Sequence, residues 1–87
     1  MTDQTMALAT REGWRSEGAA ARVHYRGASD TYSIEYYATT DRVLYWQVAE
    51  DLAVPVPRAE VPTPLRERIR RDLDAVGIDP AVEREAV

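Results

Sequence analysis

Apolar and polar residues alternate with a period of two along the first half of the chain, which is the pattern of half-buried β-strands. The alternation runs through residues 21–26, 31–38 and 43–48. The connections between these segments are too short for a crossover, so neighbouring strands must run antiparallel. The sequence therefore predicts a three-stranded antiparallel meander with one buried face and one exposed face.

The pairing of the first two strands follows from the short polar segment between them. If Arg26 pairs with Thr31, a four-residue loop results and the apolar residues of both strands share one face. The same register sets Arg22 opposite Glu35, a cross-strand ion pair that the choice of register did not assume. Two independent features therefore favour this hairpin.

The second hairpin allows two registers. A three-residue loop over residues 40–42 puts Tyr36 opposite Trp46, whereas a two-residue loop puts Trp46 opposite Glu35 and mixes the faces, so we predict the former. The predicted core face consists of Ala21, Val23, Tyr25, Tyr32, Ile34, Tyr36, Ala38, Leu44, Trp46 and Val48. The opposite face carries Arg22, His24, Arg26, Ser33, Glu35, Tyr37, Tyr45 and Gln47.

A helix is predicted on each side of the meander. Residues 3–14 form a short N-terminal helix, and residues 64–77 form a C-terminal helix with Thr63 as its N-cap and Gly77 as its stop signal. Between sheet and C-terminal helix, residues 54–64 contain four of the five prolines and are predicted as an extended, polyproline-like strap. The apolar stripe of the C-terminal helix is Leu65, Ile69, Leu73 and Val76.

The size and composition of the chain fit one small domain. Its 87 residues, 45 % hydrophobic and 30 % charged, can form one core and are too few for two. We predict a single α+β domain over residues 1–87, in the order helix, three strands, helix, with the C-terminal helix packed on one face. No cysteine is present, which excludes disulfides and the common zinc frameworks. Without a signal peptide or a long apolar stretch, a cytoplasmic protein with no membrane segment is expected.

The charge pattern is unusual in one respect. The net charge is −4, and all eleven basic residues are arginine, with no lysine. An acidic surface without lysine is favoured in a high-salt cytoplasm, because carboxylates hold water and counter-ions. A GC-rich genome would give the same composition through its arginine codons. Both explanations stay open.

No set of residues predicts catalysis, cofactor binding or a metal site. His24 is the only histidine, and it lies between Arg22 and Arg26 on the predicted exposed face, where two cations disfavour a bound metal ion. The chain has no Gly-x-Ser-x-Gly motif and no Gly-rich phosphate loop. Its paired carboxylates stand one or two residues apart and do not converge on a reacting atom. We therefore expect a non-enzymatic protein.

The exposed sheet face is the first candidate for a contact surface. In the predicted register Tyr37 and Tyr45 lie opposite each other, with Arg22, Arg26 and Val43 nearby. Tyrosine and arginine are enriched at protein interfaces, although tyrosine is also common on ordinary exposed strands. These five residues, or an open strand edge, would bind a second copy of the chain or another protein partner.

The C-terminal helix is the second candidate. A helix, three antiparallel strands and a helix is also the element order of double-stranded RNA-binding domains, in which basic residues of the last helix contact phosphates. Acidic residues interleave with the arginines of this helix, and the net charge repels a polyanion, so nucleic-acid binding is the alternative hypothesis only. The arginines concerned are Arg66, Arg68, Arg70 and Arg71.

Five stretches distributed over most of the chain carry a resemblance to known proteins. They are Glu12-Gly13-Trp14-Arg15, Ala21-Arg22-Val23-His24-Tyr25-Arg26, Tyr32-Ser33-Ile34-Glu35-Tyr36-Tyr37, Arg42-Val43-Leu44-Tyr45-Trp46 and Pro64-Leu65-Arg66-Glu67-Arg68-Ile69. Through these stretches the chain resembles a group of small uncharacterised proteins from halophilic archaea. That resemblance implies an acidic cytosolic protein adapted to salt, and it assigns no catalytic or binding residue.

Overall fold

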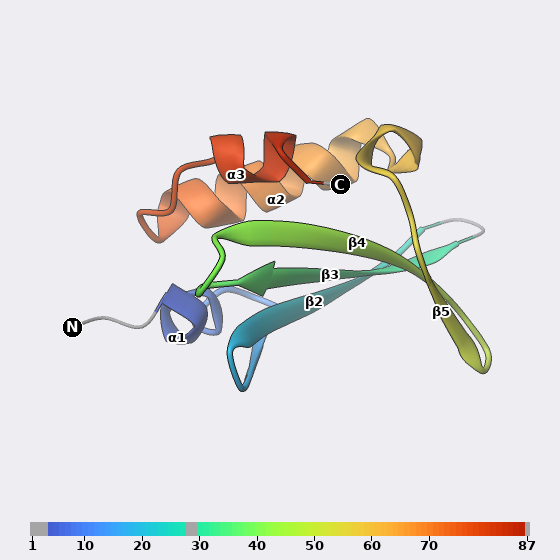
Figure 1. The fold of residues 1–87 in the computed structure, drawn as a ribbon, viewed down its shortest axis with the longest axis horizontal. Coiled ribbons are helices and arrows are strands. Elements are labelled where there is room, and N and C mark those ends of the chain that lie inside the picture. Colours follow the sequence, from blue (N-terminus) through green and yellow to red (C-terminus); the bar gives the residue numbers. More distant parts are fainter. Residues whose placement is uncertain (1–3, 28–29, 87) are drawn as a thin grey trace.

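The computed structural model of the chain describes residues 4–27 and 30–86 (Figure 1). Within these residues a five-stranded antiparallel sheet has the order β1-β2-β3-β4-β5, so each strand pairs with the next one in the sequence. The elements are α1 (Gln4–Leu8), β1 (Arg15–Glu17), β2 (Ala20–Arg26), β3 (Thr31–Tyr37), β4 (Arg42–Ala49), β5 (Leu52–Pro55), the 3-10 helix η1 (Arg58–Glu60), α2 (Thr63–Ala75) and α3 (Ala81–Arg84).

The predicted three-stranded meander is therefore wrong, because the sheet has an additional strand at each edge. Strand β1 was missed because its sequence, Arg-Ser-Glu, has no apolar alternation. It joins β2 through a two-residue loop that starts at Gly18, whose φ of 62° favours glycine. Strand β5 begins two residues before the predicted strap and overlaps its first two residues, and the sheet accepts Pro55 because β5 is an edge strand.

The first predicted register is confirmed. Arg26 pairs with Thr31, and Arg22 lies opposite Glu35. The Arg22 guanidinium donates a hydrogen bond of 2.6 Å to the Glu35 carboxylate. The predicted cross-strand ion pair is therefore present.

The second predicted register is wrong. Strand β3 ends on the pair Tyr37 with Arg42, which leaves a loop of four residues in place of three. Tyr36 now lies opposite Val43, so the faces of β4 are exchanged: Val43 and Tyr45 point into the core, whereas the predicted core residues Leu44, Trp46 and Val48 lie on the other face. The exchange was hidden because residues 43–46 are four consecutive apolar residues, which fit either face.

The last residue of the β3–β4 loop, Asp41, favours a loop of four residues. Asp41 has a φ of 53°, a left-handed conformation that aspartate tolerates better than most residues. Its carboxylate accepts a hydrogen bond of 2.6 Å from the hydroxyl of the buried Tyr36. The loop therefore satisfies a polar group of the core as it turns.

Helices α2 and α3 cover one face of the sheet (Figure 1). The prediction that the C-terminal helix packs on the sheet through Leu65, Ile69 and Leu73 is confirmed, since all three are fully buried in the main core cluster. Helix α2 ends before Gly77, whose φ is 82°, as predicted. Its N-cap is Pro62, so the prediction of Thr63 as the cap is wrong.

The N-terminal helix is shorter than predicted. Helix α1 ends at Leu8, and of the predicted span 3–14 residue 3 lies outside the described residues. Leu8 is fully buried and anchors this short helix against β1 and β2. At both ends of the sheet the hairpins β1–β2 and β4–β5 turn away from the helices (Figure 1), which gives the sheet a concave face opposite the helix layer.

Candidate functional site

The sheet face opposite the helices is the candidate functional site. We call it the uncovered face and define it by the cross-strand pairs, because paired residues point to the same side of a sheet. No helix of the described residues lies over it in Figure 1. Its residues are Arg15 and Glu17 of β1, Ala20, Arg22, His24 and Arg26 of β2, Thr31, Ser33, Glu35 and Tyr37 of β3, Arg42, Leu44, Trp46 and Val48 of β4, and Ala53 and Pro55 of β5.

The uncovered face contains an open hollow of about 310 Å³. We call this the Trp46 hollow. A smaller hollow of about 140 Å³ beside β1 shares Arg22 and His24 with it, so the two hollows adjoin. The Trp46 hollow is lined by Arg22, His24, Ser33, Glu35, Trp46, Val48 and Ala53.

Two polar residues are buried in this face although no helix covers it. Ser33 and Glu35 are each 6 % exposed. The Glu35 carboxylate is held by Arg22, which lies 3.3 Å from the Glu17 carboxylate as well. The hydrogen bond to Glu35 is the main reason why the pKa of Arg22 is raised above its ordinary value. A charged hydrogen bond therefore fixes one wall of the hollow.

Trp46 is the main aromatic residue of the hollow. Its ring is half-buried, and among the described residues its indole N–H is a buried donor without a hydrogen-bond partner. An unsatisfied buried donor costs about 1–3 kcal/mol. The fold therefore keeps the Trp46 side chain in a position where its indole N–H is unsatisfied among the described residues.

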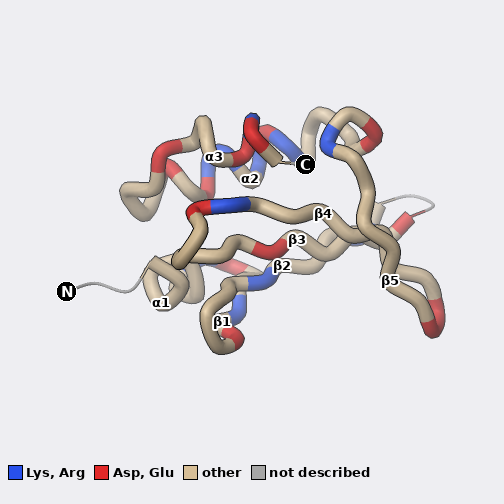
Figure 2. Tube along the Cα trace, viewed as in Figure 1, with Lys and Arg blue, Asp and Glu red and all other residues tan. Residues whose placement is uncertain are grey.

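The uncovered face has the opposite charge to the chain as a whole. It carries four arginines and two glutamates, a net charge of +2, so the remainder of the chain, whose total is −4, carries −6. Figure 2 shows blue segments on β1, on β2 and at the start of β4. Within the described residues Arg15, Arg26 and Arg42 form no ion pair with a carboxylate of the chain. Three cations of this face are therefore available to a partner.

The predicted contact surface agrees with the structure only in part. The placement of Val43 and Tyr45 on an exposed face is wrong, because each is 1 % exposed and lies under the helices. Leu44 and Trp46 occupy the corresponding positions on the uncovered face. The other three predicted residues do lie on the uncovered face, and they are Arg22, Arg26 and Tyr37.

Trp46 was predicted in the core, and not on the surface, because of the register error in the β3–β4 hairpin. One signal could have corrected it. Asp41 is a residue type that tolerates a left-handed conformation, which favours a loop that ends at Asp41 over one that continues to Arg42. A four-residue loop would have placed Trp46 beside Ser33, as observed.

A second cluster of polar residues surrounds Glu83, which is fully buried between α2, η1 and β4. Its carboxylate accepts hydrogen bonds from the Tyr45 hydroxyl at 2.8 Å, from the Arg58 Nε at 2.7 Å and from Arg70. Burial alone would raise the pKa of Glu83, but the hydrogen bonds from Arg58, Tyr45 and Arg70 lower it below its ordinary value. Burial and the bond to Glu83 raise the pKa of Tyr45. With every partner inside the chain, this cluster joins the C-terminal elements to the sheet.

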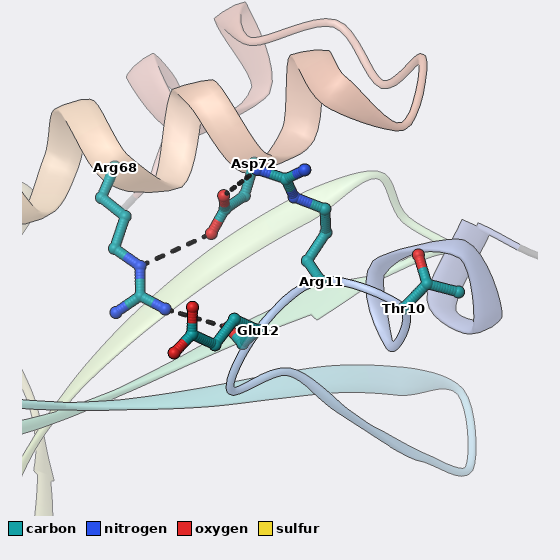
Figure 3. A pocket seen from close by; sticks show the side chains of 5 residues that line it. All are labelled: Thr10, Arg11, Glu12, Arg68 and Asp72. Carbon is teal, nitrogen blue, oxygen red and sulfur yellow. Dashed lines mark hydrogen bonds and ion pairs between the residues drawn. The ribbon is translucent and has the colours of Figure 1, made fainter.

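A third cluster surrounds Asp72 on α2 (Figure 3). The Trp14 indole N–H donates to Asp72 at 2.8 Å, and Arg11 donates to it at 3.3 Å. The Arg68 Nε lies 3.6 Å from the same carboxylate, and the Arg68 guanidinium also donates to the Glu12 carbonyl oxygen at 3.1 Å. The hollow of about 460 Å³ at this place is therefore lined by arginines that Asp72 already binds. We infer that this cluster holds residues 11–14 against α2.

The arginines of the C-terminal helix do not form one surface. Arg68 binds Asp72, Arg70 binds the buried Glu83, and Arg66 donates to the Thr63 hydroxyl at 2.9 Å. Arg71 is the exposed member of the four. Three of the four predicted nucleic-acid contacts are thus held by the protein itself.

The strand edges offer few backbone groups. The Val56 N–H donates to the Tyr45 carbonyl oxygen at 3.0 Å, so Val56 and Tyr45 form a hydrogen-bonded pair. Hydrogen-bonded and non-hydrogen-bonded pairs alternate in an antiparallel ladder. The backbone groups of Ala53 and Pro55 therefore point to the open edge. Pro55 has no N–H, which leaves Ala53 as the donor there. At the other edge β1 is three residues long. Both edges are therefore poor templates for another strand.

Two further observations concern the described residues only. They contain no group of three or more histidine, aspartate or glutamate residues that could hold a metal ion. They also contain no helix that is both long and apolar enough to cross a membrane.

Comparison with known proteins gives a family and no function. A family model described as a family of unknown function (DUF7538) matches residues 5–85. No curated protein and no solved structure matches the chain. The geometry of the chain is therefore the basis for any functional conclusion.

Proposed function

This chain belongs to the family of unknown function DUF7538, and we propose that it is a non-enzymatic accessory protein that binds another protein through the uncovered face. The observation that carries the proposal is the Trp46 hollow. A half-buried tryptophan, two buried polar residues and three available arginines lie on a concave face that no helix within residues 4–27 and 30–86 covers.

The residue types of this face support protein binding. Tryptophan, tyrosine and arginine are the residues most enriched among those that contribute strongly to interfaces, and such residues cluster in concave, well-packed places. Trp46 lies in the hollow, and Tyr37 and Arg22 lie on the same face. The helix-covered face cannot serve, since Tyr45, Val43 and their neighbours are already buried.

Nucleic-acid binding through the C-terminal helix stays a prediction with weaker support. Arg66, Arg68 and Arg70 are engaged within the chain, so a phosphate would have to displace Thr63, Asp72 or Glu83. Removing the partners of the buried Glu83 carboxylate would also destabilise the fold.

We propose a cytoplasmic setting and, from the resemblance to proteins of halophilic archaea, adaptation to salt. The absence of cysteine and the arginine-only, acidic composition support both. A fold that is more stable in about 2 M KCl than in about 0.1 M KCl would support the second part, because salt screens the repulsion between excess carboxylates.

Affinity capture with matched variants tests the proposed function. The tagged chain is incubated with lysate of its source cells, and retained proteins are identified by mass spectrometry. Trp46→Ala removes the aromatic wall of the hollow. Leu52→Ala changes an exposed apolar residue at the sheet edge, and Arg71→Ala changes an exposed arginine on α2. Circular dichroism and thermal unfolding establish that each variant is folded.

We expect one protein to be retained by the wild type, Leu52→Ala and Arg71→Ala, and to be lost with Trp46→Ala. Loss with Leu52→Ala alone would move the contact to the sheet edge and overturn the proposal. Equal retention by all four chains, or no retained protein, would overturn it as well.

A further inference from the structure

We propose that the partner presents an acidic, extended segment that places one large apolar side chain in the Trp46 hollow. This inference rests on the proposed function and names the chemistry of the partner. Its starting point is the charge of the uncovered face, +2 in a chain of −4. Complementary charge at an interface favours the encounter and suppresses partners of like charge.

The hollow is suited to one apolar side chain. Trp46, Val48 and Ala53 form an apolar side of it. Its volume of about 310 Å³ exceeds the cavity of about 150 Å³ that takes a benzene ring inside a protein core, so a phenylalanine or leucine side chain fits. An aromatic residue in a concave place is the usual anchor of an interface.

The available arginines lie on both sides of the hollow. Arg26 belongs to the cross-strand row Arg26–Thr31–Val48, which adjoins the row of Trp46 on the side of the β2–β3 loop. Arg42 lies on the other side of Trp46, at the start of β4. Arg42 and Trp46 are four residues apart on one strand, which corresponds to about 13 Å. An extended segment of a few residues spans that distance, so carboxylates on either side of the apolar residue reach one arginine each.

A second copy of the chain does not fit this face. A two-fold contact would place one face of charge +2 against another of charge +2, which is unfavourable. A contact between this face and the acidic remainder of another copy has complementary charge, but it is a head-to-tail contact that closes only for particular rotations. The charge of this face therefore disfavours the predicted homodimer.

A nucleic acid fits less well than an acidic peptide. Arg15 and Arg22 are cross-strand partners, but Glu35 lies in the hollow and Glu17 lies beside Arg22, so among the described residues carboxylates interrupt the row of cations that a phosphate backbone would follow. A peptide needs only isolated cations and a place for its apolar residue. The arrangement therefore favours the peptide.

Fluorescence anisotropy with labelled nonapeptides tests the inference. The probe has alternating glutamates and a central phenylalanine. One control peptide has glycine at its centre, and another has lysines in place of the glutamates. A single-stranded RNA of nine nucleotides tests the other class of ligand, and sedimentation of the chain alone at about 0.1 and 2 M NaCl tests self-association.

Two double variants separate the uncovered face from general charge. Arg26→Glu with Arg42→Glu reverses the two arginines that flank the hollow. Arg71→Glu with Arg84→Glu makes the same change in net charge at exposed positions of α2 and α3. Thermal unfolding establishes that both variants are folded.

We expect the acidic phenylalanine peptide to bind, and the glycine and lysine peptides to bind about tenfold more weakly or not at all. The Arg26 and Arg42 double variant should bind about tenfold more weakly, whereas the Arg71 and Arg84 control should change binding less than about twofold. Tighter binding of the lysine peptide or of RNA, dimerisation that Trp46→Ala abolishes, or no binding of the probe at about 1 mM would overturn the inference.

These outcomes are distinguishable from failure of the proposed function. If a cellular protein is captured in a Trp46-dependent manner but the acidic peptide does not bind, the inference fails and the proposed function stands. If Trp46→Ala changes neither capture nor peptide binding, both fail.

Discussion

Tyr45 and Trp46 are neighbours on one strand, and they show how the two faces of the sheet differ. Tyr45 is buried under the helices, and its hydroxyl donates to Glu83. Trp46 is half-buried on the uncovered face, and its N–H has no partner among the described residues. Each face also holds a buried carboxylate, Glu83 with three donors on one side and Glu35 with Arg22 on the other.

The two faces differ in how far their polar groups are satisfied within the chain. On the covered face the polar groups find their partners inside the chain, so changes there act on the free energy of unfolding. Among the described residues of the uncovered face, the Trp46 indole N–H lacks a hydrogen-bond partner and three arginines lack a carboxylate partner. Under the proposed function, changes on this face should therefore act first on binding.

The largest effect is expected at Glu83. Glu83→Gln leaves Arg58 and Arg70 without their buried counter-charge, and breaking a buried ion pair costs about 3–5 kcal/mol of unfolding free energy. The control Glu85→Gln removes an exposed carboxylate two residues away and should cost less than about 0.5 kcal/mol. Urea denaturation measures both. Equal costs would mean that the Glu83 cluster does not hold the covered face together.

The two tryptophans allow the same substitution on either side of the comparison. Trp14→Phe removes the donor to the buried Asp72 and should cost about 1.5–3 kcal/mol. Trp46→Phe removes a donor that has no partner within the part of the chain that the structure describes, so its cost should be smaller by about 1 kcal/mol or more. Thermal unfolding of the two variants gives the difference, and a larger cost at Trp46 would contradict the assignment of the unsatisfied donor.

The tyrosines give a smaller pair of changes. Tyr45→Phe deletes the 2.8 Å hydrogen bond to the Glu83 carboxylate and should destabilise the protein by about 1.5 kcal/mol. Tyr37→Phe, on the uncovered face, removes a half-buried hydroxyl that interacts with the Glu35 carboxylate and should cost less, about 0.5–1 kcal/mol. If chemical denaturation ranks the two variants in the reverse order, the assignment of Tyr45 to the covered face and to Glu83 is wrong.

The pH dependence of the unfolding free energy is expected to be the smallest effect, and it tests the role of Glu83 further. The pKa of Glu83 is lowered on folding, so its ionised form stabilises the protein fully above its ordinary pKa of 4.5, and this stabilisation is lost as pH falls through the lower folded value. The gap in unfolding free energy between wild type and Glu83→Gln should therefore be constant near neutral pH and narrow below 4.5. Denaturation curves between about pH 7 and 3 measure it; a gap that widens on acidification would reverse the sign.

The elements that the sequence predicted correctly have unambiguous local patterns. The β2–β3 hairpin has strict alternation of apolar and polar residues on both strands, and the ion pair between Arg22 and Glu35 supports one register. Helix α2 has an apolar stripe with a glycine stop, and Leu65, Ile69 and Leu73 are buried as expected.

The elements that were missed or misplaced lack such patterns. Strand β1 is entirely polar, and β5 is held by pairing with β4 in spite of Pro55. Four consecutive apolar residues in β4 gave no preference for either face, and only tertiary contacts such as Tyr45 with Glu83 decide it. The candidate site was therefore predicted on the correct face of β2 and β3 but with the wrong residues of β4.

Pro55 also has a consequence for the behaviour of the protein in bulk. Fibrils with a cross-β structure grow when each chain offers the next one a continuous row of donors and acceptors. The exposed Leu52 and Val54 would attract other chains, but the edge they belong to lacks an N–H at Pro55. Concentrated solutions of the folded chain should accordingly resist amyloid growth from this edge.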